Sequence, residues 1–98
     1  MPKGYWVGFA DVTDPEGYKE YVSANAAAFR KYGARFLVRG GRFEVPEGTA
    51  RSRNVVLEFK DYETALACYN SPEYAAAKAL RLGRSEANLI IIEGYDAP

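Results

Sequence analysis

The sequence predicts an α+β domain whose strands and helices follow one another in the order β-α-β-β-α-β. Three observations lead to this expectation: strand-like segments alternate with two amphipathic stretches, turn residues separate the segments closely, and 98 residues suit one domain. Since no linker, repeat or low-complexity stretch interrupts the chain, residues 1–98 are predicted to fold as a single domain.

The first strand is predicted over residues 5–12. Successive side chains of a strand point to opposite faces, so Tyr5 and Val7 would lie on one face and Trp6 and Ala10 on the other. Both faces are apolar, which means that this strand should be covered on both sides.

A helix is predicted to follow and to end at Gly33. Thr13 or Asp14 can cap it, Pro15 suits its first turn, and Gly33 suits the left-handed position after its last turn. One stripe of side chains recurs along it at three- and four-residue spacing, namely Tyr18, Tyr21, Val22, Asn25, Phe29 and Tyr32. This stripe should pack against the sheet.

The next segment is predicted to form a long hairpin. Its first strand covers residues 35–39, bends at Gly40-Gly41 and continues over residues 42–45. A turn at residues 46–48 leads into the return strand, residues 54–59.

The second helix is predicted to break in the middle. Asp61 caps its first part, and the motif Asn70-Ser71-Pro72-Glu73 stops it, because the residue before a proline disfavours helical geometry. The pair Ser71-Pro72 then starts a new helix that runs to Gly83. The last strand is predicted over residues 87–95, with isoleucines on both of its faces.

This order of elements is that of the ferredoxin-like split arrangement, a four-stranded antiparallel sheet with helices on one face. The other face is then bare, although three of the four strands are apolar on both sides. A bare apolar face of this kind marks an interaction surface. We therefore expect a homodimer in which two sheets pack face to face as a dimeric α+β barrel.

Composition narrows the classes of partner and compartment. Thirteen basic residues balance 13 acidic ones, which argues against binding to nucleic acid or to an anionic membrane surface. No segment is apolar over the ~20 residues that span a bilayer, and the N-terminus lacks the pattern of a secretory signal. We therefore expect a cytoplasmic protein without nucleic-acid or membrane partners.

The chain contains no histidine and one cysteine, Cys68. Within the chain, this excludes histidine-ligated metal or haem, Ser-His or Cys-His catalysis, a disulfide and a multi-cysteine zinc site. We therefore expect neither a metal nor a cofactor. Any proton transfer must use a carboxylate, lysine, tyrosine or cysteine, a group of the ligand, or water.

The strongest candidates for ligand contacts are Arg39 and Arg42, which flank two glycines. Guanidinium groups bind carboxylate or phosphate through paired hydrogen bonds, and glycine lets the backbone approach a ligand closely. Both belong to a basic stretch, residues 35–53, with five arginines and two glutamates. Alternatively, the arginines form ion pairs with Glu58 or Glu93, or lie on a solvated hairpin.

Five other side chains are weaker candidates. Asn25 interrupts an apolar stripe, where its amide would either orient a ligand or satisfy the backbone. Tyr18, Tyr69 and Tyr74 are either core aromatics or phenols that face a cleft. Glu93 lies beside isoleucines on the last strand, where burial would raise its pKa and suit it to act as a catalytic base.

Five motifs follow one another along nearly the whole chain: Arg39-Gly40-Gly41-Arg42, Glu47-Gly48, Val55-Val56-Leu57-Glu58-Phe59, Tyr69-Asn70-Ser71-Pro72-Glu73-Tyr74 and Ile92-Glu93-Gly94. In this combination the chain resembles the domain-of-unknown-function family thirteen-thirty (DUF1330). The resemblance implies a dimeric α+β barrel akin to antibiotic-biosynthesis monooxygenases and muconolactone isomerases, and it implies no activity. Cys68 departs from the family pattern, which usually carries a bulky aromatic there, so the pocket would differ in size or shape if this position lined it.

These observations together predict a protein that binds a small anionic or aromatic metabolite in a cleft between the helices and the sheet. Two alternatives remain open. One is a cofactor-independent monooxygenase or isomerase in which Glu93 or a tyrosine moves the proton. The other is a non-catalytic dimeric assembly module. The sequence alone does not decide whether the protein is an enzyme.

Overall fold

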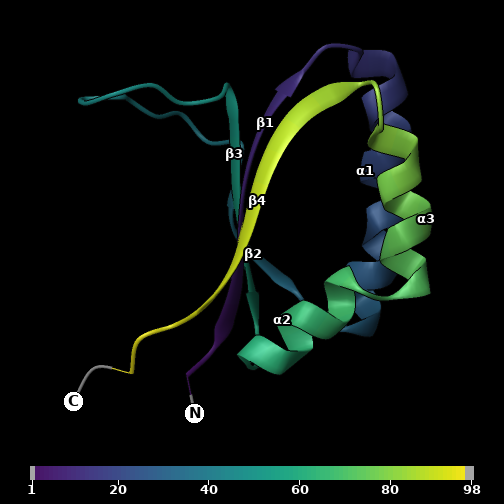
Figure 1. The fold of residues 1–98 in the computed structure, drawn as a ribbon, viewed down its shortest axis with the longest axis vertical. Helices are drawn as coiled ribbons and strands as arrows, with labels where there is room; N and C mark the ends of the chain where they lie inside the picture. The colour runs from purple at the N-terminus through teal and green to yellow at the C-terminus, as the bar shows by residue number, and fades with distance from the viewer. Residues whose placement is uncertain (1, 97–98) are drawn as a thin grey trace.

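The computed structural model describes residues 2–96, which form one antiparallel sheet with three helices on a single face (Figure 1). The elements are β1 (Gly4–Val12), α1 (Pro15–Lys31), β2 (Arg35–Arg39), β3 (Arg53–Phe59), α2 (Tyr62–Tyr69), α3 (Pro72–Arg81) and β4 (Ser85–Glu93). The strands lie in the order β2-β3-β1-β4, which confirms the predicted ferredoxin-like arrangement. Among the helices described here, none is long and apolar enough to span a membrane.

The central strand β1 separates a covered face of the sheet from an uncovered one. Trp6, Gly8 and Ala10 are buried beneath the helices, and the residues between them are half-buried on the opposite face. Neighbouring strands keep this register, with Trp6 opposite Leu57 of β3 and Ile91 of β4. The alternation predicted for the first strand is therefore confirmed.

The indole of Trp6 joins the sheet to all three helices. It is 2% exposed, and its Nε1–H donates to the carbonyl oxygen of Ala65 in α2 at 2.9 Å. Four other rings pack around it with centroid distances between 4.9 and 5.9 Å, namely Phe29, Phe59, Tyr69 and Tyr74. The core is thus largely aromatic and is centred on one side chain.

Each helix begins at the cap that the sequence indicates. The caps are Asp14 for α1, Asp61 for α2 and Ser71 for α3, and each side chain accepts a hydrogen bond from a backbone N–H in the first turn. Gly33 follows α1 with a φ of 68°, as expected for a residue just after a helix end. The predicted break between α2 and α3 is therefore confirmed.

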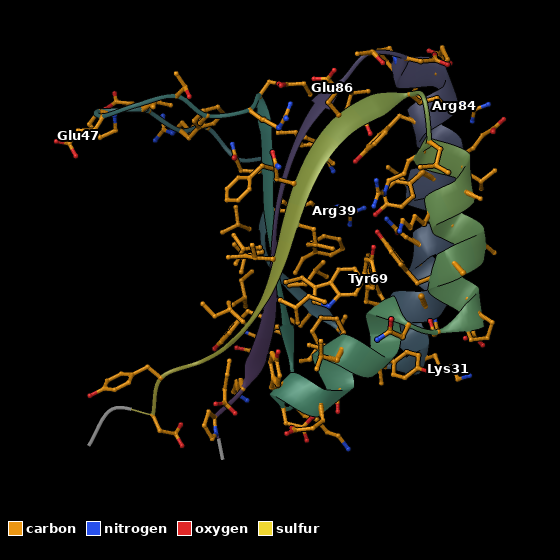
Figure 2. All side chains as sticks on the ribbon, in the orientation of Figure 1. Lys31, Arg39, Glu47, Tyr69, Arg84 and Glu86 are labelled. Carbon is orange, nitrogen blue, oxygen red and sulfur yellow. The ribbon has the colours of Figure 1, made fainter. Side chains whose placement is uncertain are left out.

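Residues 40–52 form an exposed arm that projects away from the helices, with Glu47 near its tip (Figures 1 and 2). β2 ends at Arg39, and residues 42–45 are not a strand, so the predicted continuation of the hairpin was wrong. Gly40 has a φ of 65°, and this left-handed conformation ends the strand. Beyond it the chain leaves the sheet and the two sides of the arm form no ladder.

Hydrogen bonds fix the root of the arm to the end of the sheet. Arg51 donates to Asp11 of β1 at 2.9 Å and to Asn88 of β4 at 2.7 Å. The backbone N–H of Ser52 donates to the same Asp11 carboxylate at 2.9 Å. This backbone bond and the Arg51 guanidinium hold the pKa of Asp11 below its usual value. The arm therefore leaves the sheet in a defined direction.

The uncovered face of the sheet is apolar and solvent-exposed in the single chain. Ile90 and Ile92 of β4 are 50% and 49% exposed, and Val38 of β2 is 43% exposed. They share this face with Val7 of β1, which pairs with Ile90, and with Val56 of β3, which pairs with Val38. A contiguous exposed apolar surface of this kind is typical of an interaction site.

Cys68 is part of the core. Its side chain is 0% exposed, and its Sγ lies 3.8 Å from the carbonyl oxygen of Ala28 in α1. Burial raises the pKa of the Cys68 thiol to about 12. The thiolate, which is the reactive form, is therefore nearly absent at neutral pH.

Replacing Ser71 with alanine should lower the free energy of unfolding by about 1–2 kcal/mol. The Ser71 hydroxyl donates to the carbonyl oxygen of Cys68 at 2.7 Å and accepts from the N–H of Tyr74 at 3.1 Å, and both bonds are buried. Urea titration measures the loss. The matched control is Ser23→Ala on the exposed side of α1, which should change stability by less than about 0.5 kcal/mol. Equal effects of the two changes would contradict the capping role of Ser71.

The Cys68 thiol should not react with a thiol-specific disulfide reagent in the native protein at mildly alkaline pH, because it is buried and protonated. One equivalent should react in urea, since the chain has one cysteine. The release of the coloured leaving group measures both reactions. Rapid labelling of the folded protein would contradict the buried position.

Candidate functional site

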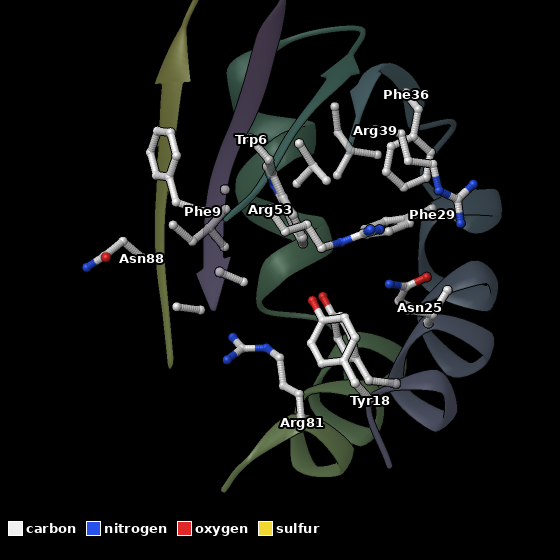
Figure 3. Close-up of a pocket in the computed structure, with 18 of the residues that line it drawn as sticks. Trp6, Phe9, Tyr18, Asn25, Phe29, Phe36, Arg39, Arg53, Arg81 and Asn88 are labelled. Atoms are coloured by element: carbon white, nitrogen blue, oxygen red, sulfur yellow. The ribbon is translucent and has the colours of Figure 1, made fainter. Parts of the chain in front are cut away.

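A half-enclosed cavity of about 70 Å³ lies between the helices and the covered face of the sheet (Figure 3). The helices α1 and α3 form one wall, and all four strands contribute to the other. Much of its lining is aromatic: Trp6, Tyr18, Tyr21, Phe29, Phe36 and Tyr74. Phe9 and Asn88 also border the cavity, but their side chains point away from it (Figure 3).

Small residues of β1 leave the space that the cavity occupies. Gly8 and Ala10 lie on the covered face and line the cavity. A Cβ atom at Gly8 would stand 3.1 Å from Cγ2 of Val55 and 3.6 Å from Cδ1 of Leu89. A side chain at Gly8 would therefore press against Val55, which would have to shift by a few tenths of an ångström.

Three arginines reach the cavity from three different elements: Arg39 at the end of β2, Arg53 at the start of β3 and Arg81 at the end of α3 (Figure 3). No aspartate, glutamate or lysine lines the cavity. Within residues 2–96, none of the three guanidinium groups forms an ion pair with a carboxylate. The cavity therefore carries three positive charges and no compensating negative charge.

The register of the sheet places Arg53 at the cavity. Arg53 pairs with Ala10 of β1, so its side chain lies on the covered face together with those of Val55 and Leu57. Its Nη1 lies near Gly40, where an added Cβ would come within 3.1 Å of it. The absence of a side chain at Gly40 therefore leaves room for this guanidinium beside the end of β2.

Polar groups on α1 and α3 complete the lining. The hydroxyls of Tyr21 and Tyr74 are 2.9 Å apart in a buried hydrogen bond, and Asn25 is 7% exposed. Burial raises the pKa of Tyr21. Burial also raises the pKa of Tyr18, although the positive charges of Arg53 and Arg81 act in the opposite direction. Tyr18 and Tyr21 are therefore neutral at physiological pH, and the Tyr18 hydroxyl can donate a hydrogen bond to a ligand.

The structure brings four of the seven predicted site residues together. Arg39, Asn25, Tyr18 and Tyr74 all line the cavity. The Arg39 guanidinium lies over the ring of Phe36, with its Cζ 4.3 Å from the ring centroid. Asn25 and the two tyrosines thus border the same cavity as Arg39.

The other predicted residues lie elsewhere. Arg42 is exposed on the arm, and Glu93 is exposed at the far end of β4, so the burial on which its expected basicity depended is absent. Tyr69 packs against Trp6 and accepts a hydrogen bond from Lys78 at 2.8 Å, outside the cavity lining. Cys68 does not line the cavity either. Its departure from the family pattern therefore does not alter the lining of the cavity.

Sequence reasoning did not single out Arg53, Arg81 and Tyr21 as site residues. Arg53 lies two residues before Val55 on β3, and side chains two residues apart in a strand point to the same face. This two-residue period indicates that Arg53 lies on the covered face. Arg81 lies seven residues after Tyr74 on the same side of α3. Both signals exist in the sequence, but neither indicates that the two side chains border one cavity.

Comparison with solved structures supports the fold. The chain is similar to a protein of unknown function from Rhodopseudomonas palustris, with a TM-score of 0.78 and 13% identity over 98% of this chain and 85% of that one. It is also similar to SnoaB, a cofactor-independent oxygenase from Streptomyces nogalater, with a TM-score of 0.65 and 12% identity over 99% and 97% of the two chains.

A dimeric ferredoxin-like protein of unknown function from Thermobifida fusca matches with a TM-score of 0.63 and 13% identity, over 94% of this chain and 91% of that one. No curated protein matches the sequence. The model of the domain of unknown function DUF1330 matches residues 3–95. The predicted resemblance is thereby confirmed, and the chain belongs to the DUF1330 family.

Proposed function

We propose that this protein binds a small organic anion with an aromatic or other planar apolar body. The observation that carries this proposal is the set of three arginines, Arg39, Arg53 and Arg81, which face an aromatic cavity without any carboxylate among its lining residues. A ligand that brings a negative charge and a flat apolar surface complements both features.

Electrostatics favour an anion over a neutral ligand. At an effective dielectric constant of about 20, a unit anion 4 Å from one guanidinium gains roughly 4 kcal/mol before the cost of desolvation. The fork of a guanidinium suits a carboxylate in particular, because two parallel hydrogen bonds form at once. The hydroxyl of Tyr18 and the amide of Asn25 can add further bonds.

The size of the cavity favours a ligand with one ring. A sealed cavity of roughly 150 Å³ holds benzene, whereas this one measures about 70 Å³ and is open on one side. A single ring would therefore lie against the aromatic lining, beside Trp6 and Phe29, and remain partly exposed at the mouth. Larger ligands would have to extend into solvent.

Binding is the function that the geometry supports best, and catalysis has less support. SnoaB is an oxygenase, but at 12% identity its likeness to this chain concerns the fold. The cavity lining contains arginines, tyrosines and an asparagine, and no carboxylate that would serve as a general base. In an oxygenase or isomerase with this lining, the proton would have to pass to water or to the ligand itself.

We further propose that a second copy of the chain covers the exposed apolar face of the sheet. Ile90, Ile92 and Val38 are about half exposed on that face. The arm, residues 40–52, leaves the sheet on the same side (Figure 1), and its Phe43 and Val45 are exposed. Two sheets packed face to face around a twofold axis would bury these side chains, and each arm would lie alongside the partner.

Benzoate should quench or shift the fluorescence of Trp6, while benzamide, its neutral analogue, should bind at least tenfold more weakly. Trp6 is the one tryptophan of the chain and lines the cavity, so its emission reports binding at this site. Arg53→Gln should weaken benzoate binding about ten- to hundredfold, because it removes a charge-assisted hydrogen bond. Fluorescence titration measures both comparisons.

Arg42→Gln is the matched control for that experiment. It removes the same charge from the exposed arm, away from the cavity, and should leave benzoate affinity within about twofold. Equal affinity for benzoate and benzamide would contradict anion binding. Equal losses from the two arginine changes would mean that benzoate binds through the general charge of the protein and not in the cavity.

Ile90→Glu should convert a dimer into a monomer, because it places a charge in the apolar interface. Light scattering at micromolar concentration measures the mass, which should fall from about twice 10.9 kDa to 10.9 kDa. The control is Leu82→Glu, which changes an exposed leucine at the end of α3, away from the sheet. A monomeric wild-type protein, or a dimer that survives Ile90→Glu, would contradict the proposed interface.

A further inference from the structure

We propose, building on the ligand site proposed above, that the cavity recognises a diacid: a ligand with two acidic groups held apart on a flat apolar spacer. The three arginines do not form one cluster. Arg39 and Arg53 lie together on the sheet side, and Arg81 lies apart from them on the helix side (Figure 3).

The first group, defined as Arg39 and Arg53, belongs to two paired strands. Arg39 pairs with Val55, and Arg53 precedes Val55 by two residues on the same face of β3. The Nη1 of Arg53 lies against Gly40, the residue next to Arg39. The two positive charges on this side of the cavity repel each other, and a carboxylate bound between them would relieve that repulsion.

Arg81 forms the second point of recognition, within the helix layer. Its Cζ lies 5.7 Å from the centroid of the Tyr21 ring, which belongs to α1. In Figure 3 its guanidinium points toward the β4 side of the cavity, away from Arg39 and Arg53. The linked hydroxyls of Tyr21 and Tyr74 also line this cavity. A second acidic group placed here would meet a cation and neutral donors.

The surface between the two points is apolar. Trp6 and Leu57 line the cavity on the sheet side, and Phe29 lines it from α1. A rigid aromatic or unsaturated spacer matches such walls better than a flexible chain, because it loses less conformational entropy on binding. The class of ligand is therefore a planar diacid, with the benzenedicarboxylates as simple representatives.

The test compares each benzenedicarboxylate, in its ortho, meta and para forms, with its own monomethyl ester by isothermal titration calorimetry. The ester keeps the ring and one acid and masks the other. At least one diacid should bind wild-type protein about tenfold or more tightly than its ester, the gain expected of one charge-assisted contact. Melting temperatures of all variants establish that each is folded.

Variants then locate the second contact. Arg81→Gln should remove the advantage of the diacid and leave the affinity of the monoester within about twofold, whereas Arg53→Gln should weaken both ligands. Arg42→Gln on the arm should change neither. Should the first change disturb folding, Arg81→Lys, which keeps the charge and loses the fork, should reduce the advantage in part.

Three outcomes would overturn the diacid inference, and they differ in whether the proposed anion site is also contradicted. If monoesters bind and no diacid gains over its ester, two-point recognition fails and the anion site remains. If Arg81→Gln weakens diacid and monoester equally, the three arginines act as one subsite. If neither benzoate nor any of these acids binds, the proposed function fails as well.

Discussion

The layers of this fold depend on the packing of one indole, that of Trp6. It stands on the central strand, donates to the Ala65 carbonyl oxygen of α2, and meets aromatic rings from α1, α2, α3 and β3. Domains of this size are stable by roughly 5–15 kcal/mol, and truncating one buried aromatic residue costs about 3–5 kcal/mol. A single side chain therefore contributes a large share of the free energy of unfolding, and with it of the packing between the helices and the sheet.

Aromatic rings also hold two of the three cations that border the cavity. Arg39 lies over Phe36, with its Cζ 4.3 Å from the ring centroid, and Arg81 lies 5.7 Å from that of Tyr21. The face of an aromatic ring attracts a guanidinium group and restrains its orientation. Because this attraction leaves the N–H groups at the guanidinium edge available, the arginines are oriented by the protein and remain able to bind an anion.

Local signals predicted most of the fold, whereas the site depends on contacts between distant segments. Asp14 and Pro72 act within a few residues of themselves, and the helix boundaries they indicate are confirmed. The strand predicted over residues 42–45 failed, because β pairing requires a partner that the local pattern does not reveal. Arg53 and Arg81 border the same cavity only through the register of β3 with β1 and the packing of α3 on α1. No periodicity within either segment contains that information.

Gly8 is a position where the cavity can change without a change in the fold. A sheet is held by its backbone ladder, so residues on the covered face of β1 can change in size while every strand pairing is kept. An added methyl group at Gly8 would meet Val55 at 3.1 Å and would require only a small adjustment of that side chain. On the proposed function, the side chain at this position would set the depth of the ligand site one carbon atom at a time, on an unchanged scaffold.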